Sequence, residues 1–197
     1  MLHSNAFSSS LISRTKTLIF IVSILAVSGV AVELVAGMWD ATSHLMREPE
    51  RFWTIQHIAV YTGVGMISCS AILGSLVIIT NSKKKTLTKG LKIIIIGTVL
   101  QLTAGYADSI SHDIYGVDGL VSASHLVLET GLALSALGGF MTLCRVDKQK
   151  TTKLLPTAIM TVLLSITWIG FNLALIFGAV VLCVPVYEIF SSGCAVF

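Results

Sequence analysis

The chain has 197 residues, of which 54% are apolar and 12% are charged, with a net charge of +3 and a mean hydropathy of +0.88. Soluble domains carry about 25% charged residues, so this composition excludes a soluble enzyme, a nucleic-acid-binding protein and a disordered chain. It predicts one all-α membrane domain over residues 1–197, a polytopic helix bundle in contact with membrane lipids.

Five apolar runs are long enough to cross the membrane, because a helix needs roughly 20 residues to span about 30 Å of hydrocarbon. Pro185 follows the last run and is expected to end it. The tail from 187 to 197 is compatible with lying at the membrane surface or turning back into the membrane. The predicted helices are 17–39, 53–80, 91–112, 121–144 and 155–183.

The basic residues are distributed unevenly between the connections. Eleven of the thirteen precede the first helix or lie around the second and fourth connections, and only Arg47 and Arg51 lie in the first. The positive-inside rule therefore predicts a cell-membrane protein with a cytoplasmic N-terminus and an external C-terminus. A removable signal peptide is the alternative for the first helix, which has a basic flank and small residues near 29–31.

A repeat at an offset of 68 residues favours keeping the first helix. Residues 36–63 match 104–131 at eight of 28 positions without a gap. Because the offset covers two helices, the halves are expected to be parallel repeats related by an axis along the membrane normal. Repeat 1 covers about 17–80 and repeat 2 about 91–144, and the helix at 155–183 is additional.

The matched positions include a D-x3-H-x12-H pattern in each repeat. An Asp and a His four residues apart lie on one helix face, and the second His lies near the outer start of the next helix. Each set of three is therefore expected to converge near the outer surface, giving two metal sites. The predicted ligands are Asp40, His44 and His57 in repeat 1, and Asp108, His112 and His125 in repeat 2.

Two imidazoles and one carboxylate suit copper, iron or zinc, and three protein ligands leave a position open for water or substrate. Glu129 lies four residues after His125 and is predicted to supplement the second site, whereas Tyr61 occupies the equivalent place in repeat 1. The extra carboxylate would favour zinc or iron(II) at site two, and copper is expected to prefer site one.

Other polar and small residues have simpler interpretations. Glu33 and Gln101 lie seven residues before the two aspartates, two turns deeper in each repeat. Asn172 in the last helix is expected to hydrogen-bond a neighbouring helix rather than a ligand. Close helix packing is predicted at Gly63, Gly65, Gly138 and Gly139.

Three alternatives to an enzymatic metal site remain at this point. The Asp and His residues could cap helix ends without binding anything. Four histidines on four helices could clamp haem b, which would make the protein a b-type cytochrome. A membrane protein that binds or delivers a metal without catalysis is the third.

The doubled pattern resembles the C subunit of the copper membrane monooxygenases, the family of particulate methane and ammonia monooxygenase. That subunit carries a D-x3-H-x12-H ligand set, matched by Asp40, His44 and His57, and a second set that typically starts with Asn, where this chain has Asp108. The segment Gly90-Leu91-Lys92 looks like the short archaeal forms, and the resemblance covers about 16–145. It implies a copper-binding, archaeal-type paralogue that works with other membrane subunits, with oxidoreductase activity in the complex.

Overall fold

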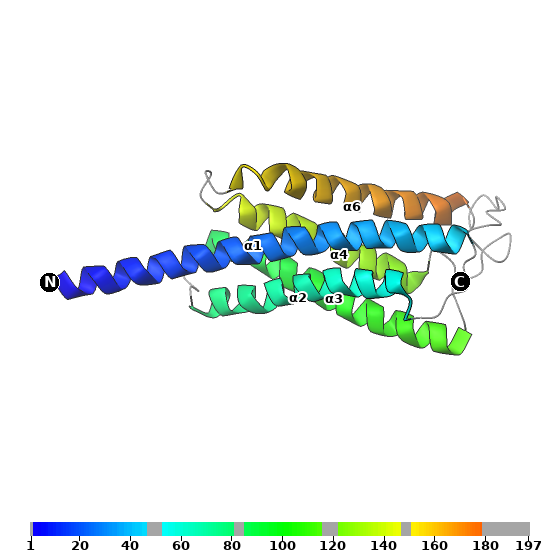
Figure 1. The fold of residues 1–197 in the computed structure, drawn as a ribbon, viewed down its shortest axis with the longest axis horizontal. Coiled ribbons are helices and arrows are strands. Elements are labelled where there is room, and N and C mark those ends of the chain that lie inside the picture. Colours follow the sequence, from blue (N-terminus) through cyan, green and yellow to red (C-terminus); the bar gives the residue numbers. More distant parts are fainter. Residues whose placement is uncertain (1, 47–52, 81–84, 116–121, 147–150, 179–197) are drawn as a thin grey trace.

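The computed structural model describes residues 2–46, 53–80, 85–115, 122–146 and 151–178. Within these ranges the structure describes the backbone alone at residues 2–14, 44, 45, 85–87, 112, 113 and 115. All of the regular structure in the described ranges is helical, so the all-α prediction is confirmed. The helices are α1 (Leu2–Leu45), α2 (Ile55–Thr80), α3 (Lys85–Tyr115), α4 (Ala123–Leu143) and α6 (Leu155–Ile176) (Figure 1).

Each of these helices contains a stretch long and apolar enough to cross a membrane, which confirms the predicted spans. The spans are Thr15–Ser43, Ile55–Thr80, Thr88–Ser111, Ala123–Leu143 and Leu155–Ile176. Large apolar side chains, such as Val35, Ile72 and Ile79, lie exposed on the outside of the bundle. Such a surface is suited to lipid contact.

Helix ends differ from the sequence prediction where a helix continues past its apolar run. Helix α1 begins at Leu2 rather than near residue 17 and projects beyond the bundle, and α3 begins at Lys85 rather than near 91. Backbone hydrogen bonding propagates along the chain independently of hydropathy, so the apolar run marks the span and not the whole helix. The predicted end of the last helix, 179–183, lies outside the described residues.

The chain folds as two helix pairs, α1 with α2 and α3 with α4, and the same glycine contact holds each pair together. A Cβ atom on Gly63 would lie 2.7 Å from the carbonyl oxygen of Gly29, and one on Gly131 would lie 2.6 Å from that of Gly97. Only glycine allows backbones to approach so closely. Because these positions are again 68 residues apart, the sequence repeat is also a repeat of helix packing.

Close helix packing was predicted at four glycines, and the structure shows it at three of them. A Cβ on Gly138 would lie 2.7 Å from the Gly90 carbonyl oxygen, and one on Gly139 would lie 3.1 Å from the Cβ of Ala26. Gly65 is the exception, because nothing lies within 4 Å of the position its Cβ would take. It is two residues from Gly63 and therefore on a different face of α2.

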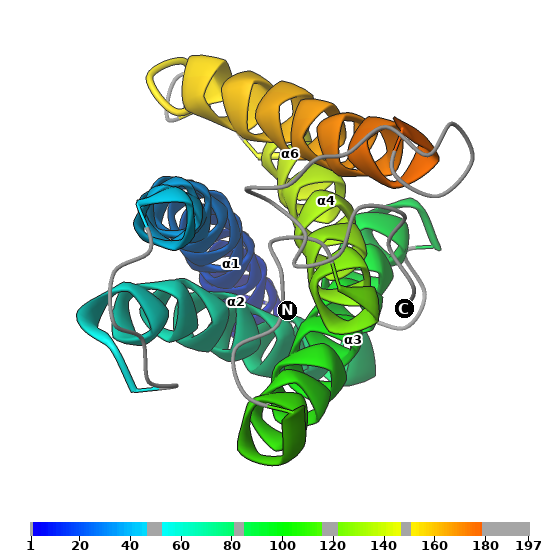
Figure 2. The ribbon, with the colours of Figure 1, turned by 90° about the vertical axis from the view of Figure 1, so that its right-hand side faces the viewer.

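The two pairs combine into a four-helix bundle with approximate two-fold symmetry, in which α1 packs on α4 as α2 packs on α3. Figure 2 shows this arrangement from the end, with α6 lying across α4 and α1. The α2–α3 side has no counterpart of α6 within the described part of the chain. Buried aliphatic side chains, among them Val22, Ile67, Leu91 and Ile94, form the core between the helices.

Candidate metal centre

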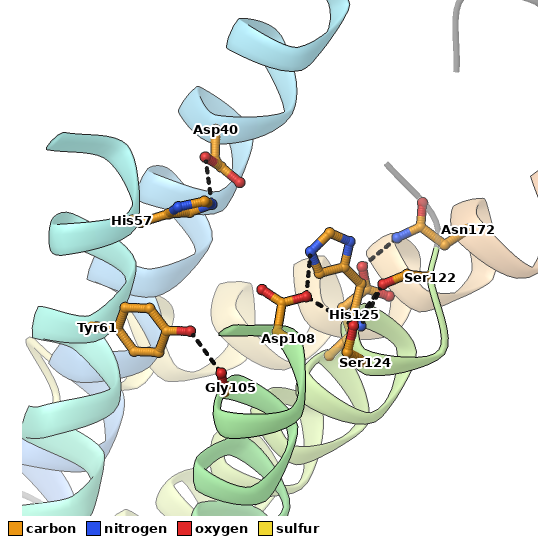
Figure 3. A network of polar contacts seen from close by, with 10 residues as sticks. Asp40, His57, Tyr61, Gly105, Asp108, Ser122, Ser124, His125 and Asn172 are labelled. Carbon is orange, nitrogen blue, oxygen red and sulfur yellow. Dashed lines mark hydrogen bonds and ion pairs between the residues drawn. The ribbon is translucent and has the colours of Figure 1, made fainter. Parts of the chain in front are cut away.

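Each repeat brings one aspartate and one histidine into contact at the same end of the bundle. The Nε2 atom of His57 lies 3.3 Å from Oδ1 of Asp40, and Nε2 of His125 lies 3.4 Å from Oδ1 of Asp108 (Figure 3). The residues come from the C-terminal parts of α1 and α3 and from the first turns of α2 and α4. In each predicted set of three, the aspartate and the second histidine are thus in contact.

The histidines are held by the way their helices begin. Ser122 is the N-cap of α4, and its side chain accepts a hydrogen bond from the backbone N–H of His125 at 3.2 Å. Thr54 precedes α2 and accepts from the backbone N–H of His57 at 3.4 Å. A hydroxyl at this position satisfies an N–H that has no partner within the helix. Each imidazole thus sits at the third residue of a capped helix.

The surroundings of the two aspartates differ. Ser124 donates a hydrogen bond to Oδ1 of Asp108 at 2.8 Å, and its hydroxyl lies 2.8 Å from that of Ser122. The equivalent residue in repeat 1 is Gln56, whose amide donates to Ser43 Oγ at 2.9 Å. Hydrogen bonds through Ser124 therefore connect the Asp108 carboxylate to the N-cap residue Ser122. In repeat 1, the residue equivalent to Ser124 bonds Ser43 instead.

Both Asp–His pairs open into one cavity at the centre of the bundle. Its volume is about 80 Å³, enough for several water molecules. The two pairs line its outer part, and Glu33, Tyr61, Glu129 and Trp168 line it further in. Among the described lining residues there are four carboxyl groups, two imidazoles and no Lys or Arg. The chemistry of the cavity therefore favours a cation.

The distances within the pairs suit two ligands of one ion. Ligand atoms about 2.0–2.1 Å from a tetrahedral zinc or copper ion lie about 3.3–3.4 Å from each other, which is the separation seen in both pairs. A direct N–H···O hydrogen bond is normally shorter, about 2.7–3.2 Å. The nitrogen and oxygen donors present in each pair thus fit a transition metal.

The third predicted ligand of each set, His44 or His112, lies one helical turn after its aspartate on α1 or α3. The side chains of both lie outside the described residues. Among the side chains that the structure describes, no group of three Asp, Glu, His or Cys is close enough together to hold a metal ion. The two sets of three ligands therefore remain predictions. The observed geometry covers only the Asp–His pair of each set.

Glu129 lines the same cavity but is held from the side of α6. Its Oε1 accepts hydrogen bonds from Trp168 Nε1 at 2.8 Å and from Asn172 Nδ2, whereas its Oε2 is buried without a hydrogen-bond partner. The expectation that Asn172 bonds a neighbouring helix is confirmed. Whether Glu129 supplements the second metal set remains a prediction.

Sequence reasoning missed the residues that position the ligands. Thr54 and Ser122 are 68 residues apart, and each is a hydroxyl residue three positions before a histidine. This N-cap signature, extended over the repeat, would have found them. Trp168 gave a weaker signal, since it lies four residues before Asn172 and so on the same face of α6. Comparison of the chain with protein-family models, curated proteins and solved structures gave no match.

Proposed function

We propose that this protein is a multi-pass membrane protein that binds copper at two Asp–His–His sites, as the resembled C subunit does in a copper monooxygenase. The observation that carries the proposal is the Asp–His contact made twice, at 3.3 and 3.4 Å, facing one cavity free of basic side chains among its described lining. Site one would use Asp40, His44 and His57. Site two would use Asp108, His112 and His125, with Glu129 as a supplementary carboxylate.

The duplication argues against a purely structural role for these residues. Ionisable side chains within membrane helices are costly and usually functional, and here two are buried and two partly buried at equivalent places. Helix capping is done by Thr54 and Ser122, so the histidine side chains are not needed as caps. Imidazole with carboxylate suits copper, zinc and iron, and copper(II) has the highest affinity in that series.

Copper bound here would supply one-electron redox chemistry with dioxygen in a complex that oxidises a small substrate such as ammonia or methane. The chain's own residues would orient the ligands through the two helix caps and exclude bulk water from the bundle. Electrons would come from partner membrane subunits and an external reductant. The enzymatic part of the proposal therefore concerns the complex and not the isolated chain.

We place the sites on the outer side of the cell membrane, with the N-terminus in the cytoplasm. The end of the bundle opposite the Asp–His pairs carries the described basic residues Lys89, Lys92, Arg145 and Lys153, because α3 and α6 begin there and α4 ends there. Cysteines introduced at positions 48 and 117 of a cysteine-free variant should react with an impermeant reagent added outside. Labelling of both from the cytoplasmic side alone would reverse this orientation.

The decisive experiment is metal analysis with optical and electron paramagnetic resonance spectroscopy of the purified chain. We expect copper in the wild type, and the loss of more than half of it in Asp40→Asn with His57→Ala, because copper is expected to prefer site one. The matched variant, Asp108→Asn with His125→Ala, should lose the smaller remainder. Full copper retention in both variants would contradict the proposal.

Two other functions are separated by the same measurement. A Soret band that disappears in His57→Ala would identify a b-type cytochrome. Copper binding without oxygen-dependent turnover in the native complex would identify a protein that binds or delivers the metal. The spectra and the turnover assay therefore distinguish the three functions, and the variants locate the metal.

A further inference from the structure

Glu33 of α1 is a buried acid with no visible partner. Its side chain lines the central cavity, the residue is 2% exposed, and neither carboxyl oxygen has a hydrogen-bond partner. Its backbone is fixed, because a Cβ on Gly63 would lie 2.8 Å from both the nitrogen and the Cβ of Glu33. A buried polar group without a partner costs free energy, so this residue requires an explanation beyond packing.

Glu129 of α4 lines the same cavity and also has one carboxyl oxygen without a hydrogen-bond partner. The residue is 6% exposed, and both of its donors, Trp168 Nε1 and Asn172 Nδ2, approach Oε1. Oε2 is left buried without a partner. The contact with α6 thus fixes the carboxyl group while one oxygen stays available.

The two acids lie at similar depths below the Asp–His pairs. Glu33 precedes Asp40 by seven residues and Glu129 follows His125 by four, which at 1.5 Å per residue is about 10 and about 6 Å along the helix axes. The difference of about 4 Å is within the reach of two glutamate side chains. Both therefore face the inner part of the cavity, below the ligands of the outer sites.

The symmetry of the bundle shows that the acids are gathered on one side. The residue equivalent to Glu33 is Gln101 of α3, and the residue equivalent to Glu129 is Tyr61 of α2. Because α1 packs on α4 and α2 packs on α3, both acids lie on helices that pack on each other, and so do both neutral residues. Tyr61 of α2 contacts α3 directly, because its hydroxyl donates to the Gly105 carbonyl at 3.3 Å.

We propose that Glu33 and Glu129 form a separate cation site at the inner end of the cavity, which binds a hard divalent ion through carboxylate oxygens and water. The side chains of Glu33 and Glu129 line this space, and three of their four carboxyl oxygens are buried without a hydrogen-bond partner. Oxygen-only ligand sets suit magnesium, calcium and manganese rather than copper. The cavity volume of about 80 Å³ leaves room for the ion with water ligands. This site goes beyond the proposed function, because it adds Glu33, which belongs to neither copper site, and joins it to Glu129, the supplementary carboxylate of site two.

Manganese(II) binding to the purified full-length chain tests the proposal, because bound manganese loses the sharp electron paramagnetic resonance signal of the free ion. We expect one saturable site in the wild type and at least tenfold weaker binding in Glu33→Gln and in Glu129→Gln. Glu33→Gln is a conservative variant, since it places in repeat 1 the residue that repeat 2 already has at Gln101. Glu129→Gln keeps an oxygen that can accept from Trp168 and Asn172.

The control is the double variant His57→Ala with His125→Ala, which removes the outer imidazoles and should bind manganese as the wild type does. Copper content measured on Glu33→Gln, whose side chain belongs to neither outer site, reports whether the outer sites and the fold are intact in that variant. The absence of saturable manganese binding to the wild type would overturn the inner site, as would unchanged binding in both glutamate variants. Loss of manganese in the histidine variant would also overturn it, because the ion would then belong to the outer sites.

Discussion

Repeat 1 and repeat 2 share a backbone arrangement but differ in the polar residues they place on it. The contact between Gly29 and Gly63 recurs between Gly97 and Gly131, and the Asp–His contact recurs at nearly the same distance. Two residues that line the cavity in one repeat are replaced in the other, since Glu33 corresponds to Gln101 and Tyr61 to Glu129. The packing and the metal ligands are thus duplicated, and the deeper polar positions have diverged.

The difference is explained by what each position contacts. A glycine at a helix crossing faces backbone, which is equivalent in both repeats, so no other residue fits in either. Position 129 faces α6, where Trp168 and Asn172 donate to it, whereas position 61 faces α3. The two repeats are therefore equivalent at the glycine contacts inside each helix pair. They differ at position 129, where α6 packs on repeat 2.

The strongest test of the shared backbone is Gly63→Ala with its equivalent, Gly131→Ala. The added Cβ would lie 2.6–2.7 Å from a carbonyl oxygen and 2.8–3.0 Å from a backbone nitrogen of the partner helix, and this backbone cannot move without separating the pair. We expect each variant to lose about 2–3 kcal/mol of folding free energy, measured by unfolding of the purified protein in detergent.

Gly65→Ala is the matched control on the same helix, because nothing lies within 4 Å of its Cβ position. Replacing glycine by alanine at an open helical position is expected to stabilise it by about 0.5–1 kcal/mol. If Gly63→Ala and Gly65→Ala were equally stable, the close crossing of α1 and α2 would be wrong.

Glu129 of repeat 2 accepts a hydrogen bond from α6, whereas its equivalent in repeat 1, Tyr61, donates to α3. Asn172→Leu removes one donor to Glu129 and is expected to cost about 1.5 kcal/mol, near the upper end for hydrogen bonds between membrane helices. Thermal unfolding of Asn172→Leu, Glu129→Gln and the double variant gives the coupling between the two residues. Additive effects would show that the bond contributes nothing to stability.

The helix caps offer a smaller comparison between the repeats. Ser122→Ala should cost about 1 kcal/mol and should also weaken metal binding at Asp108, because Ser122 holds Ser124 against that carboxylate. Thr54→Ala should cost less, about 0.5 kcal/mol, since its bond to His57 is longer. Isothermal titration with copper of both variants checks this order, and a larger loss in Thr54→Ala would reverse it.

Tyr61→Phe is expected to have the smallest effect. Its hydroxyl donates to the Gly105 carbonyl at 3.3 Å, a long bond whose loss should cost about 0.5 kcal/mol. Metal content should not change. A large loss of copper in this variant would place Tyr61 in the metal centre and remove the contrast with position 129.

The fold was largely predictable from the sequence, because each apolar run long enough to cross a membrane is a helix. Asp40 with His57, and Asp108 with His125, were also predictable, since their spacing is repeated and helical periodicity brings them to one end of the bundle. The sequence did not reveal that both pairs share a cavity, because the spacing within one repeat carries no information on how the repeats pack.

The role of α6 was also beyond the sequence. Trp168 and Asn172 belong to no repeat, and their contact with Glu129 joins residues 39 and 43 positions apart in the chain. Gly65 shows the opposite failure, because a glycine in a membrane helix is an ambiguous sign of close packing. Only the position of the neighbouring helix distinguishes it from Gly63.

The pairing of α1 with α4 and of α2 with α3 is the arrangement that two identical two-helix chains would form about a two-fold axis. One repeat thus carries both halves of a self-complementary surface, and the present chain has the architecture of a duplicated and fused gene. In a dimer of identical chains every substitution appears twice, so an acid at position 33 would always be accompanied by another across the axis. Fusion removes that constraint, so that α1 and α4 can carry the acids Glu33 and Glu129 where α3 and α2 carry Gln101 and Tyr61.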